Sequence, residues 1–297
     1  MLPPGSRIAK VTVPILTNST WFGQGHLDSG RGDGRLAPMR VLTFNVNGLR
    51  SASRKGFLDW LPTSGADIAC LQETRVPEVE RAELKLGAAG YVGHYADALR
   101  PGYAGVAILS RREPDEIERG WGVPEFDDEG RLLAARFGSL WVISLYLPSG
   151  SLGPERQASK DRFLDAFPEA LARFRNRGPL ILAGDFNIAH RPIDLRNAKA
   201  NEKHSGFLPH ERAWLDWLFS ADGGLVDAFR VVNPDPDQYT FWSNRGRAYE
   251  KNVGWRIDYE AVTPDLARTV QSASIYKTQR FSDHAPLMLD YEIGSPG

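Results

Sequence analysis

The sequence has few cysteines: Cys70 is the only one among 297 residues. A single cysteine cannot form a disulfide within the chain, and it excludes a zinc site built from several thiolates. Cys70 lies in the apolar run from Ile68 to Leu71, where we expect it to be a small buried side chain. The absence of disulfides suits a reducing compartment, and we expect a cytoplasmic protein.

The sequence also lacks long apolar runs and an excess of charge of either sign. No run approaches ~18 apolar residues, so we expect no membrane-spanning segment and no membrane partner. The 36 basic residues nearly balance the 37 acidic ones, for a net charge of −1. This balance argues weakly against a nucleic-acid partner. A balanced total can nevertheless hide a basic rim around an acidic site.

Residues 1–38 differ in composition from the rest of the chain. They hold Pro3, Pro4, Pro14 and Pro38, a glycine-rich stretch from Gly23 to Gly34, and only a short apolar run. This pattern is neither a signal peptide nor a polybasic arm, so we expect a loosely ordered extension. Met39 directly precedes the first expected strand, which leaves open a start at that residue. We expect residues 39–297 to form a single domain.

From Arg40 onward, strand-like and helix-like segments alternate. We expect strands at Arg40–Val46, Ile68–Leu71, Gly105–Ser110, Leu140–Leu147, Leu180–Ala183, Tyr239–Trp242, Arg256–Val262 and Leu287–Tyr291. We expect helices at Lys55–Leu61, Pro77–Leu86, Arg156–Arg177 and Pro209–Phe219. Strands that alternate with helices, and in part pair as hairpins, predict an α/β sandwich.

Polar clusters stand at the ends of apolar runs. They are Asn45 with Asn47, Gln72 with Glu73 and Thr74, Asp185 with Asn187, and Asp283 with His284. Each has an ordinary interpretation, such as turn chemistry at Asn47-Gly48, a helix cap at Glu73, an Asx turn at Asp185 or a surface histidine. Together they indicate one site assembled by folding. Carboxylates and amides with one strong imidazole suit Mg²⁺ and a phosphate, so we interpret the chain as a metal-dependent phosphodiesterase acting on DNA.

Two further groups extend this site. Asp258 lies inside an apolar segment, where a carboxylate needs a partner, and we expect His284 to be that partner. Phe241, Trp242 and Trp255 are aromatic residues near these motifs. They either pack in the core or line an apolar pocket that admits an extruded sugar without a base. Basic and glycine-rich loops are also present at Gly48–Arg50, Arg54–Lys55 and Gly102–Gly105, and they suit either phosphate contacts or simple solvation.

These residues, in this order, resemble the exonuclease III family of apurinic/apyrimidinic (AP) endonucleases, part of the endonuclease/exonuclease/phosphatase superfamily. The resemblance runs from about Val41 to Tyr291. Its specific motifs are Phe44–Arg50, Leu71–Thr74, Gly184–Ile188, Gly206–Pro209, Trp255–Asp258 and Ser282–His284. The segments Ile193–Asn197 and Tyr239–Trp255 look like the branch that contains the main human enzyme.

The resemblance implies a four-layered α/β sandwich of the deoxyribonuclease I type, with two mixed sheets flanked by helices. It implies a monomeric, nucleoid-associated catalytic domain that cleaves duplex DNA 5′ to abasic sites, with 3′→5′ exonuclease or 3′-end trimming activity. The implied cofactor is Mg²⁺, with Mn²⁺ expected to substitute.

The implied metal residues are Asn45, Asn47, Glu73, Asp185, Asn187 and Asp283. The implied catalytic residues are Tyr146, Asp185, Asn187, Asp258 and His284, with either Asp185 or Tyr146 as the base. The implied substrate-binding residues are Arg50, Gly102, Tyr103, Asn201, Phe241, Trp255 and Ile257.

Some features depart from this pattern, and two alternatives remain. The segment Tyr146–Leu152 has no arginine where the human-like branch has one that enters DNA, and His204 stands where that branch has an asparagine. The first alternative is a phosphoesterase of the same superfamily that acts on inositol phosphates, sphingomyelin or RNA. The second is a DNA-binding protein without activity, which would be expected to lack one of the site residues.

Overall fold

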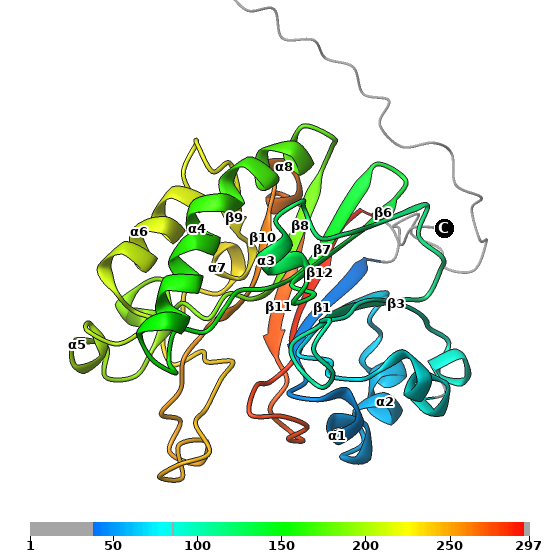
Figure 1. Ribbon diagram of the computed structural model, residues 1–297, viewed down its shortest axis with the longest axis horizontal. Helices are drawn as coiled ribbons and strands as arrows, with labels where there is room; N and C mark the ends of the chain where they lie inside the picture. The colour runs from blue at the N-terminus through cyan, green and yellow to red at the C-terminus, as the bar shows by residue number, and fades with distance from the viewer. Residues whose placement is uncertain (1–37, 85, 294–297) are drawn as a thin grey trace, which may run out of the picture. The chain divides into compact units, whose positions relative to one another are not determined.

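The computed structural model describes residues 38–84 and 86–293. These residues form two six-stranded sheets that pack face to face, with helices outside (Figure 1). The expected extension over residues 1–38 lies, except for Pro38, outside the described residues, and it stays a prediction. The single domain expected over residues 39–297 stays a prediction as well.

The first sheet has the strand order β11-β12-β1-β2-β4-β3. Its strands are β1 (Met39–Asn45), β2 (Ile68–Gln72), β3 (Val92–Ala96), β4 (Val106–Ser110), β11 (Val270–Ile275) and β12 (Leu287–Tyr291). The second sheet has the order β5-β6-β7-β8-β10-β9. Its strands are β5 (Glu116–Arg119), β6 (Leu132–Phe137), β7 (Leu140–Tyr146), β8 (Leu180–Asp185), β9 (Val226–Asp227) and β10 (Asp258–Val262). In each sheet one central pair is parallel, β1 with β2 and β7 with β8.

Most of the helices lie in two outer layers, and two short ones contribute to the core between the sheets. The α-helices are α1 (Leu49–Arg54), α2 (Phe57–Trp60), α3 (Pro124–Asp127), α4 (Pro154–Arg175), α5 (Ala198–Asn201), α6 (Pro209–Leu218), α7 (Ala228–Val232) and α8 (Pro264–Ala267). Short 3₁₀ helices are η1 (Leu61–Ser64), η2 (Glu78–Leu84), η3 (Leu86–Ala89) and η4 (Pro192–Asp194). One core packs α3, α4 and α6 on the second sheet, another packs α1 and α2 on the first, and a third lies between the sheets. The expected four-layered α/β sandwich is therefore confirmed.

The alternation of side chains along the strands decides which residues face the other sheet. In β1, Met39 and Val41 belong to the core between the sheets, whereas Leu42 and Phe44 belong to the outer core. Asn45 points toward the other sheet, as Met39 and Val41 do, because every second side chain along a strand lies on the same face. The same rule applies in β8, where Ile181 and Ala183 point inward, so that Asp185 also does. The two polar residues thus face each other at one end of the sandwich.

The sequence correctly predicted the central strands and the long helices but not every element. Tyr239–Trp242 is not a strand, because its backbone forms only isolated bridges from Phe241 to Trp255 and His284. Pro77–Leu86 is not one helix, since a 3₁₀ helix covers only Glu78–Leu84. The helix expected over Lys55–Leu61 is limited to α2, and Arg256–Ile257 precede β10. The strands β3, β5, β6, β9 and β11 and the short helices α1, α3, α5, α7 and α8 were not predicted.

Two other expectations can be compared with the structure. Cys70 is fully buried between the sheets, as expected for a small apolar side chain. In the part of the chain that the structure describes, no helix combines the length and apolar character needed to cross a membrane.

Candidate active site

The four polar clusters meet at one end of the sandwich, but strand ends supply only part of the site. Asn45 and Asp185 end β1 and β8, whereas Asp258 begins β10. Asp283 and His284 precede β12 rather than follow a strand. Because β12 runs antiparallel to β1, and β10 antiparallel to β8, the starts of β10 and β12 lie beside the ends of their neighbours.

The backbone bends sharply after β1, β2 and β8. Asn47, Glu73 and Asn187 have φ angles of 44°, 52° and 52°, in the left-handed region. Asparagine tolerates this region, but a glutamate rarely adopts it. Such backbone costs of order 1–3 kcal/mol per residue and clusters at functional sites. The fold therefore stabilises three strained turns that bring side chains into the site.

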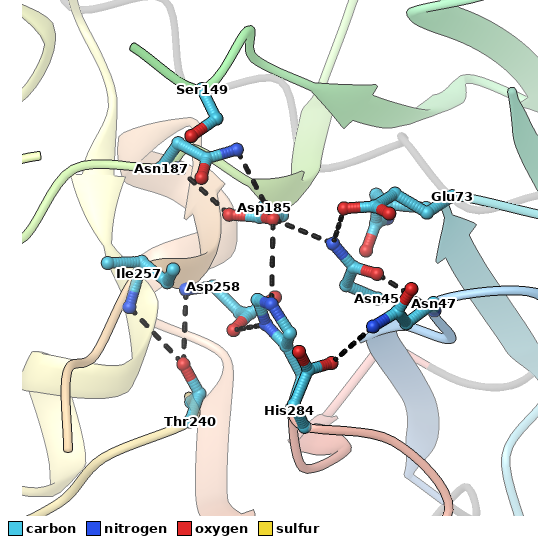
Figure 2. Close-up of polar contacts among 12 residues, drawn as sticks. Asn45, Asn47, Glu73, Ser149, Asp185, Asn187, Thr240, Ile257, Asp258 and His284 are labelled. Carbon is cyan, nitrogen blue, oxygen red and sulfur yellow. Dashed lines mark hydrogen bonds and ion pairs between the residues drawn. The ribbon is translucent and has the colours of Figure 1, made fainter. Parts of the chain in front are cut away.

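Asp185 lies at the centre of the site (Figure 2). Its Oδ2 accepts a hydrogen bond of 2.8 Å from Asn45 Nδ2, and its Oδ1 accepts one of 2.9 Å from the backbone N–H of Asn187. Asn187 Nδ2 lies 3.4 Å from Asp185 Oδ2 and donates to the carbonyl of Leu147 at 2.9 Å. The carboxylate of Asp185 is therefore held on both sides.

His284 stands between two carboxylates. Its Nδ1 lies 2.8 Å from Asp258 Oδ2, and its Nε2 lies 3.8 Å from Asp185 Oδ2. Asp258 is fully buried, and its backbone N–H donates to Thr240 Oγ1 at 3.2 Å, as does that of Ile257. The expected Asp258–His284 pair is therefore present, and Nε2 is the imidazole nitrogen that faces Asp185.

Burial and the neighbouring charges change the pKa of both central groups. Burial raises the pKa of Asp185 to about 7, although the charge of His284 opposes the shift. Burial alone would lower the pKa of His284, but the charges of Asp258 and Asp185 outweigh it and raise the pKa to about 10. At neutral pH, His284 is thus an imidazolium, and Asp185 has a pKa close to that of an efficient general base.

Glu73 has its own set of partners. Its Oε1 accepts hydrogen bonds from Asn45 Nδ2 at 2.9 Å and from the Tyr146 hydroxyl at 2.7 Å, and Oε2 pairs with Arg75. Burial, together with the charges of Glu73 and Asp185, raises the pKa of Tyr146 well above its ordinary value. Tyr146 is therefore a neutral phenol that donates a hydrogen bond to Glu73.

The carboxylate oxygens of the site are suitable ligands for Mg²⁺. Asp185, Asp258 and His284 offer ligand atoms within 4.8 Å of one another, but a protonated imidazole cannot bind a metal. Mg²⁺ prefers oxygen, which the carboxylates of Glu73, Asp185 and Asp283 supply. Burial would raise the pKa of Asp283, but the charge of His284 and the hydrogen bonds from Asn47 and Ser282 keep it below its ordinary value.

The asparagine amides act as donors around these carboxylates. Asn45 Nδ2 bridges Glu73 and Asp185, and Asn47 Nδ2 donates to Asp283 Oδ1 at 3.0 Å. Asn45 Oδ1 in turn accepts from the backbone N–H of Asn47. The residues therefore fit a cation held by carboxylates, whereas direct ligation by Asn45, Asn47 or Asn187 stays a prediction.

An apolar wall adjoins His284. Phe241, Trp255 and Ile257 pack in one cluster with Leu195 and Phe207. The ring of Phe241 lies 4.9 Å from the imidazole of His284, centroid to centroid. Phe241 and Trp255 keep part of their surface open, so this cluster can contact a substrate.

The remaining predicted substrate residues lie at varying places around the site. Arg50 follows the Asn47 turn and pairs with Glu80. Gly102 and Tyr103 belong to a loop whose next residues, Ala104 and Gly105, accept hydrogen bonds from the backbone N–H groups of Arg75 and Thr74. Asn201 lies at the end of α5, where its amide donates to the carbonyl of Asn197. The structure gives none of these side chains a contact with the central carboxylates.

A polar cavity of about 340 Å³ opens beside Asp283. It is lined by Asn47, Ser51, Lys55, Asn244, Arg280, Ser282 and Asp283. Lys55 and Arg280 place positive charge next to the carboxylates, as a basic rim requires. Arg280 had not been recognised from the sequence, although it lies three residues before Asp283.

Three buried polar residues of the site were also missed. Thr240 accepts hydrogen bonds from the Ile257 and Asp258 backbone, and Lys160 and Glu211 form a fully buried ion pair beside Asn187. A signal was present for the pair: each charged residue occupies the apolar face of an expected helix, Lys160 with Phe163 and Glu211 with Trp214.

The chain is similar to known proteins over most of its length. Residues 42–284 match the model of the Endonuclease/Exonuclease/phosphatase family. The chain belongs to this family. It is 38% identical over 257 residues to an exodeoxyribonuclease of Bacillus subtilis, covering 86% of this chain and 100% of the relative. It is 38% identical over 260 residues to the DNA repair nuclease APEX1 of Danio rerio, covering 86% and 83%. The structure of an AP endonuclease from Archaeoglobus fulgidus superposes with a TM-score of 0.78 at 30% identity, covering 86% and 100%.

Membership of the endonuclease/exonuclease/phosphatase family confirms the resemblance on which the sequence interpretation rested. The relatives are of the exonuclease III type, and the protein is accordingly a hydrolase of phosphodiesters. The deoxyribonuclease I-like form of the sandwich is confirmed by the same structural match.

Proposed function

We propose that the protein is a Mg²⁺-dependent DNA repair nuclease that cleaves the phosphodiester 5′ to abasic sites in duplex DNA. We include a 3′→5′ exonuclease or 3′-end trimming activity in this proposal, with Mn²⁺ able to replace Mg²⁺. The supporting observation is the placement of Asp185 between Asn45, Asn187 and His284. The names of the relatives support DNA as the substrate and repair as the process.

Asp185 is the general base in this proposal. Asn45 and the backbone of Asn187 hold its carboxylate, and its pKa of about 7 leaves much of it ionised at neutral pH. It accepts a proton from water while the water oxygen forms a bond to phosphorus. Tyr146 is a poor base because its raised pKa keeps the phenol neutral, so its role is to orient Glu73.

His284 stabilises the charge that develops on the phosphate. Asp258 holds the ring through Nδ1, so Nε2–H is directed at the centre and can donate to a phosphoryl oxygen. The bond from phosphorus to the 3′ oxygen breaks, and that oxygen takes a proton from solvent water to become a 3′-hydroxyl. Glu73, Asp185 and Asp283 would hold Mg²⁺, which would supply Lewis-acid stabilisation of the charge that develops in the reaction.

The apolar cluster and the basic rim support an abasic duplex as the substrate. Phe241 lies against His284, and Trp255 and Ile257 pack in the same cluster, so these residues offer an apolar surface to a sugar that carries no base. Lys55 and Arg280 line the cavity beside Asp283 and supply positive charge there, and Arg50 and the loop of Gly102 and Tyr103 are proposed as DNA contacts. Asn201 is proposed as a further DNA contact. We propose one catalytic domain acting as a monomer in the cytoplasm.

A competition between substrate classes tests the proposal. The purified protein is incubated with an abasic duplex and, separately, with an inositol phosphate, sphingomyelin and an RNA oligonucleotide. The proposal expects Mg²⁺-dependent cleavage of the abasic duplex at a kcat/KM at least ~100-fold above that for the others. Faster turnover of any other substrate would replace the proposed function with a different phosphoesterase activity.

A further inference from the structure

Lys160 of α4 and Glu211 of α6 form an ion pair that is fully buried. Lys160 Nζ lies 2.6 Å from Glu211 Oε1, and both side chains are 0% exposed. Burial lowers the pKa of Lys160, although the charge of Glu211 opposes the shift. A buried ion pair seldom stabilises a protein more than apolar residues of similar size would. Its presence therefore calls for another explanation.

The lysine is bonded to the catalytic turn. Besides Glu211, Lys160 Nζ donates to the backbone carbonyl of Asn187 at 2.9 Å. Asn187 is the residue whose N–H and side chain hold Asp185, and its φ of 52° is one of the strained angles of the site. Lys160 thus contacts the same turn that holds the Asp185 carboxylate.

The glutamate is bonded to the apolar wall beside His284. Glu211 Oε2 accepts hydrogen bonds from the backbone N–H groups of Gly206 at 2.7 Å and Leu208 at 3.0 Å. Between them lies Phe207, whose ring meets that of Trp255 edge-on at 6.5 Å. A Cβ on Gly206 would stand 3.1 Å from the carbonyl oxygen of Asn187, so the two segments are in close contact.

We propose that the Lys160–Glu211 pair is a positioning device. It holds the catalytic turn at Asn187 in a fixed position relative to the apolar wall that contains Phe207 and Trp255. This inference rests on the proposed function, since it assigns the wall to the substrate and Asp185 to the chemistry. Both residues act through others: Lys160 through Asn187, and Glu211 through Phe207. A displacement of about 1 Å at the turn is enough to lower turnover by about 100-fold.

The variants must avoid leaving a charge buried alone. Lys160→Met alone would leave the Glu211 carboxylate buried without its ion-pair partner and would destabilise the fold. The test therefore uses a double variant, Lys160→Met with Glu211→Gln. Methionine keeps the apolar stem, and glutamine still accepts from Gly206 and Leu208 but removes the charge. The matched control is Arg40→Met with Asp290→Asn, which removes an ion pair from the opposite end of β1.

The readout separates positioning from stability. On the substrate that the wild type cleaves best, the double variant should keep KM within about 3-fold and lose about 10- to 100-fold in kcat. The control pair should retain the wild-type kcat. Lys160→Arg with Glu211 intact should recover most of the lost turnover, because its guanidinium can still donate to both partners.

A mutant cycle that combines Asn187→Gly with the Lys160→Met, Glu211→Gln variant tests whether the ion pair acts through the catalytic turn. Glycine accepts the positive φ but removes the side chain that holds Asp185. In this background, adding Lys160→Met with Glu211→Gln should lower kcat by clearly less than it does in the wild type, because the Asn187 side chain no longer reaches Asp185 and only the backbone N–H remains to be displaced. Full additivity of the two effects, or an unchanged kcat in the double variant, would overturn the inference. If the wild type cleaves no abasic duplex but another phosphodiester, only the proposed function fails, and the cycle is run on that substrate.

Discussion

Asn45 and Asp185 belong to different sheets, yet Asn45 Nδ2 donates to Asp185 Oδ2 at 2.8 Å. The same amide donates to Glu73 Oε1 at 2.9 Å, so that one side chain joins the expected base to the expected metal carboxylate. The contact depends on the packing of the sheets, because neither residue lies near the other in the sequence. The proposed catalytic chemistry is accordingly coupled to the structure of the core.

The charge state of His284 depends on Asp258, and this can be observed without metal or DNA. With Asp258 in place, the pKa of His284 is about 10, so the ring stays protonated up to about that pH. Asp258→Asn removes the largest charge that raises this pKa, so that burial, which lowers it, is opposed only by the charges of Asp185 and Asp283. Nitrogen-15 NMR of the ring at about pH 8 should show an imidazolium in the wild type and a neutral ring in the variant. A neutral wild-type ring at that pH would contradict the assignment.

The metal dependence should respond to Glu73. Glu73→Gln removes one carboxylate of the proposed oxygen set but keeps the size of the side chain. We expect half-maximal activity to need at least ~10-fold more Mg²⁺, as measured by titration of the cleavage rate. Glu113→Gln, which alters an exposed carboxylate paired with His94, is the matched control and should leave the titration unchanged. An identical curve for Glu73→Gln would remove this residue from the metal site.

Asp185 and Tyr146 can be separated as candidates for the base. Asp185→Asn should lower kcat by about 10²- to 10⁴-fold, because it removes the proton acceptor. Tyr146→Phe should lower kcat by about 10-fold, since it removes only a hydrogen bond to Glu73. Steady-state rates at saturating Mg²⁺ decide between them. The assignment is wrong if the phenylalanine variant is the more impaired of the two.

Stability should depend on pH through Glu260, a residue outside the proposed chemistry. Glu260 is fully buried in β10, where it accepts a hydrogen bond from the Tyr291 hydroxyl, and burial raises its pKa well above the ordinary value. The folded protein therefore holds a proton that the unfolded chain releases above pH ~4.3. Its contribution to stability is complete below that pH and declines as pH rises toward the folded pKa.

The variant Glu260→Gln removes this proton linkage. Its free energy of unfolding should exceed that of the wild type by more at about pH 8 than at about pH 5. Urea denaturation at the two pH values measures the difference. An equal difference at both would show that Glu260 does not titrate on unfolding in this range.

Much of the fold was predictable because the central strands are buried on both faces. β1, β2, β4, β7 and β8 read as apolar runs, and the long helices have a regular apolar face. Edge strands gave weaker signals: β5 is Glu116–Arg119, with three charged residues, and β11 is largely exposed. Tyr239–Trp242 resembles a strand in composition, but its backbone instead joins Trp255 and His284 by isolated bridges.

The site was predictable in its residue types but not in its geometry. Asp185, Glu73 and His284 stood out because carboxylates and an imidazole follow or precede apolar runs. The direction of β10 and β12, which brings Asp258 and Asp283 to the ends of β8 and β1, depends on sheet order and could not be predicted from the residues. Lys160 and Glu211 were overlooked because each looks like a lone charge on a helix, and only packing brings them together.

The most direct test of the account is cleavage of a duplex with one central abasic site, with Mg²⁺ and with EDTA, beside an intact duplex and the Asp185→Asn variant. The account predicts a single incision immediately 5′ to the abasic position that leaves a 3′-hydroxyl, requires Mg²⁺ and is absent in the variant. A folded wild-type protein that leaves the abasic duplex intact with Mg²⁺ present, or cleaves it equally well in EDTA, would contradict it.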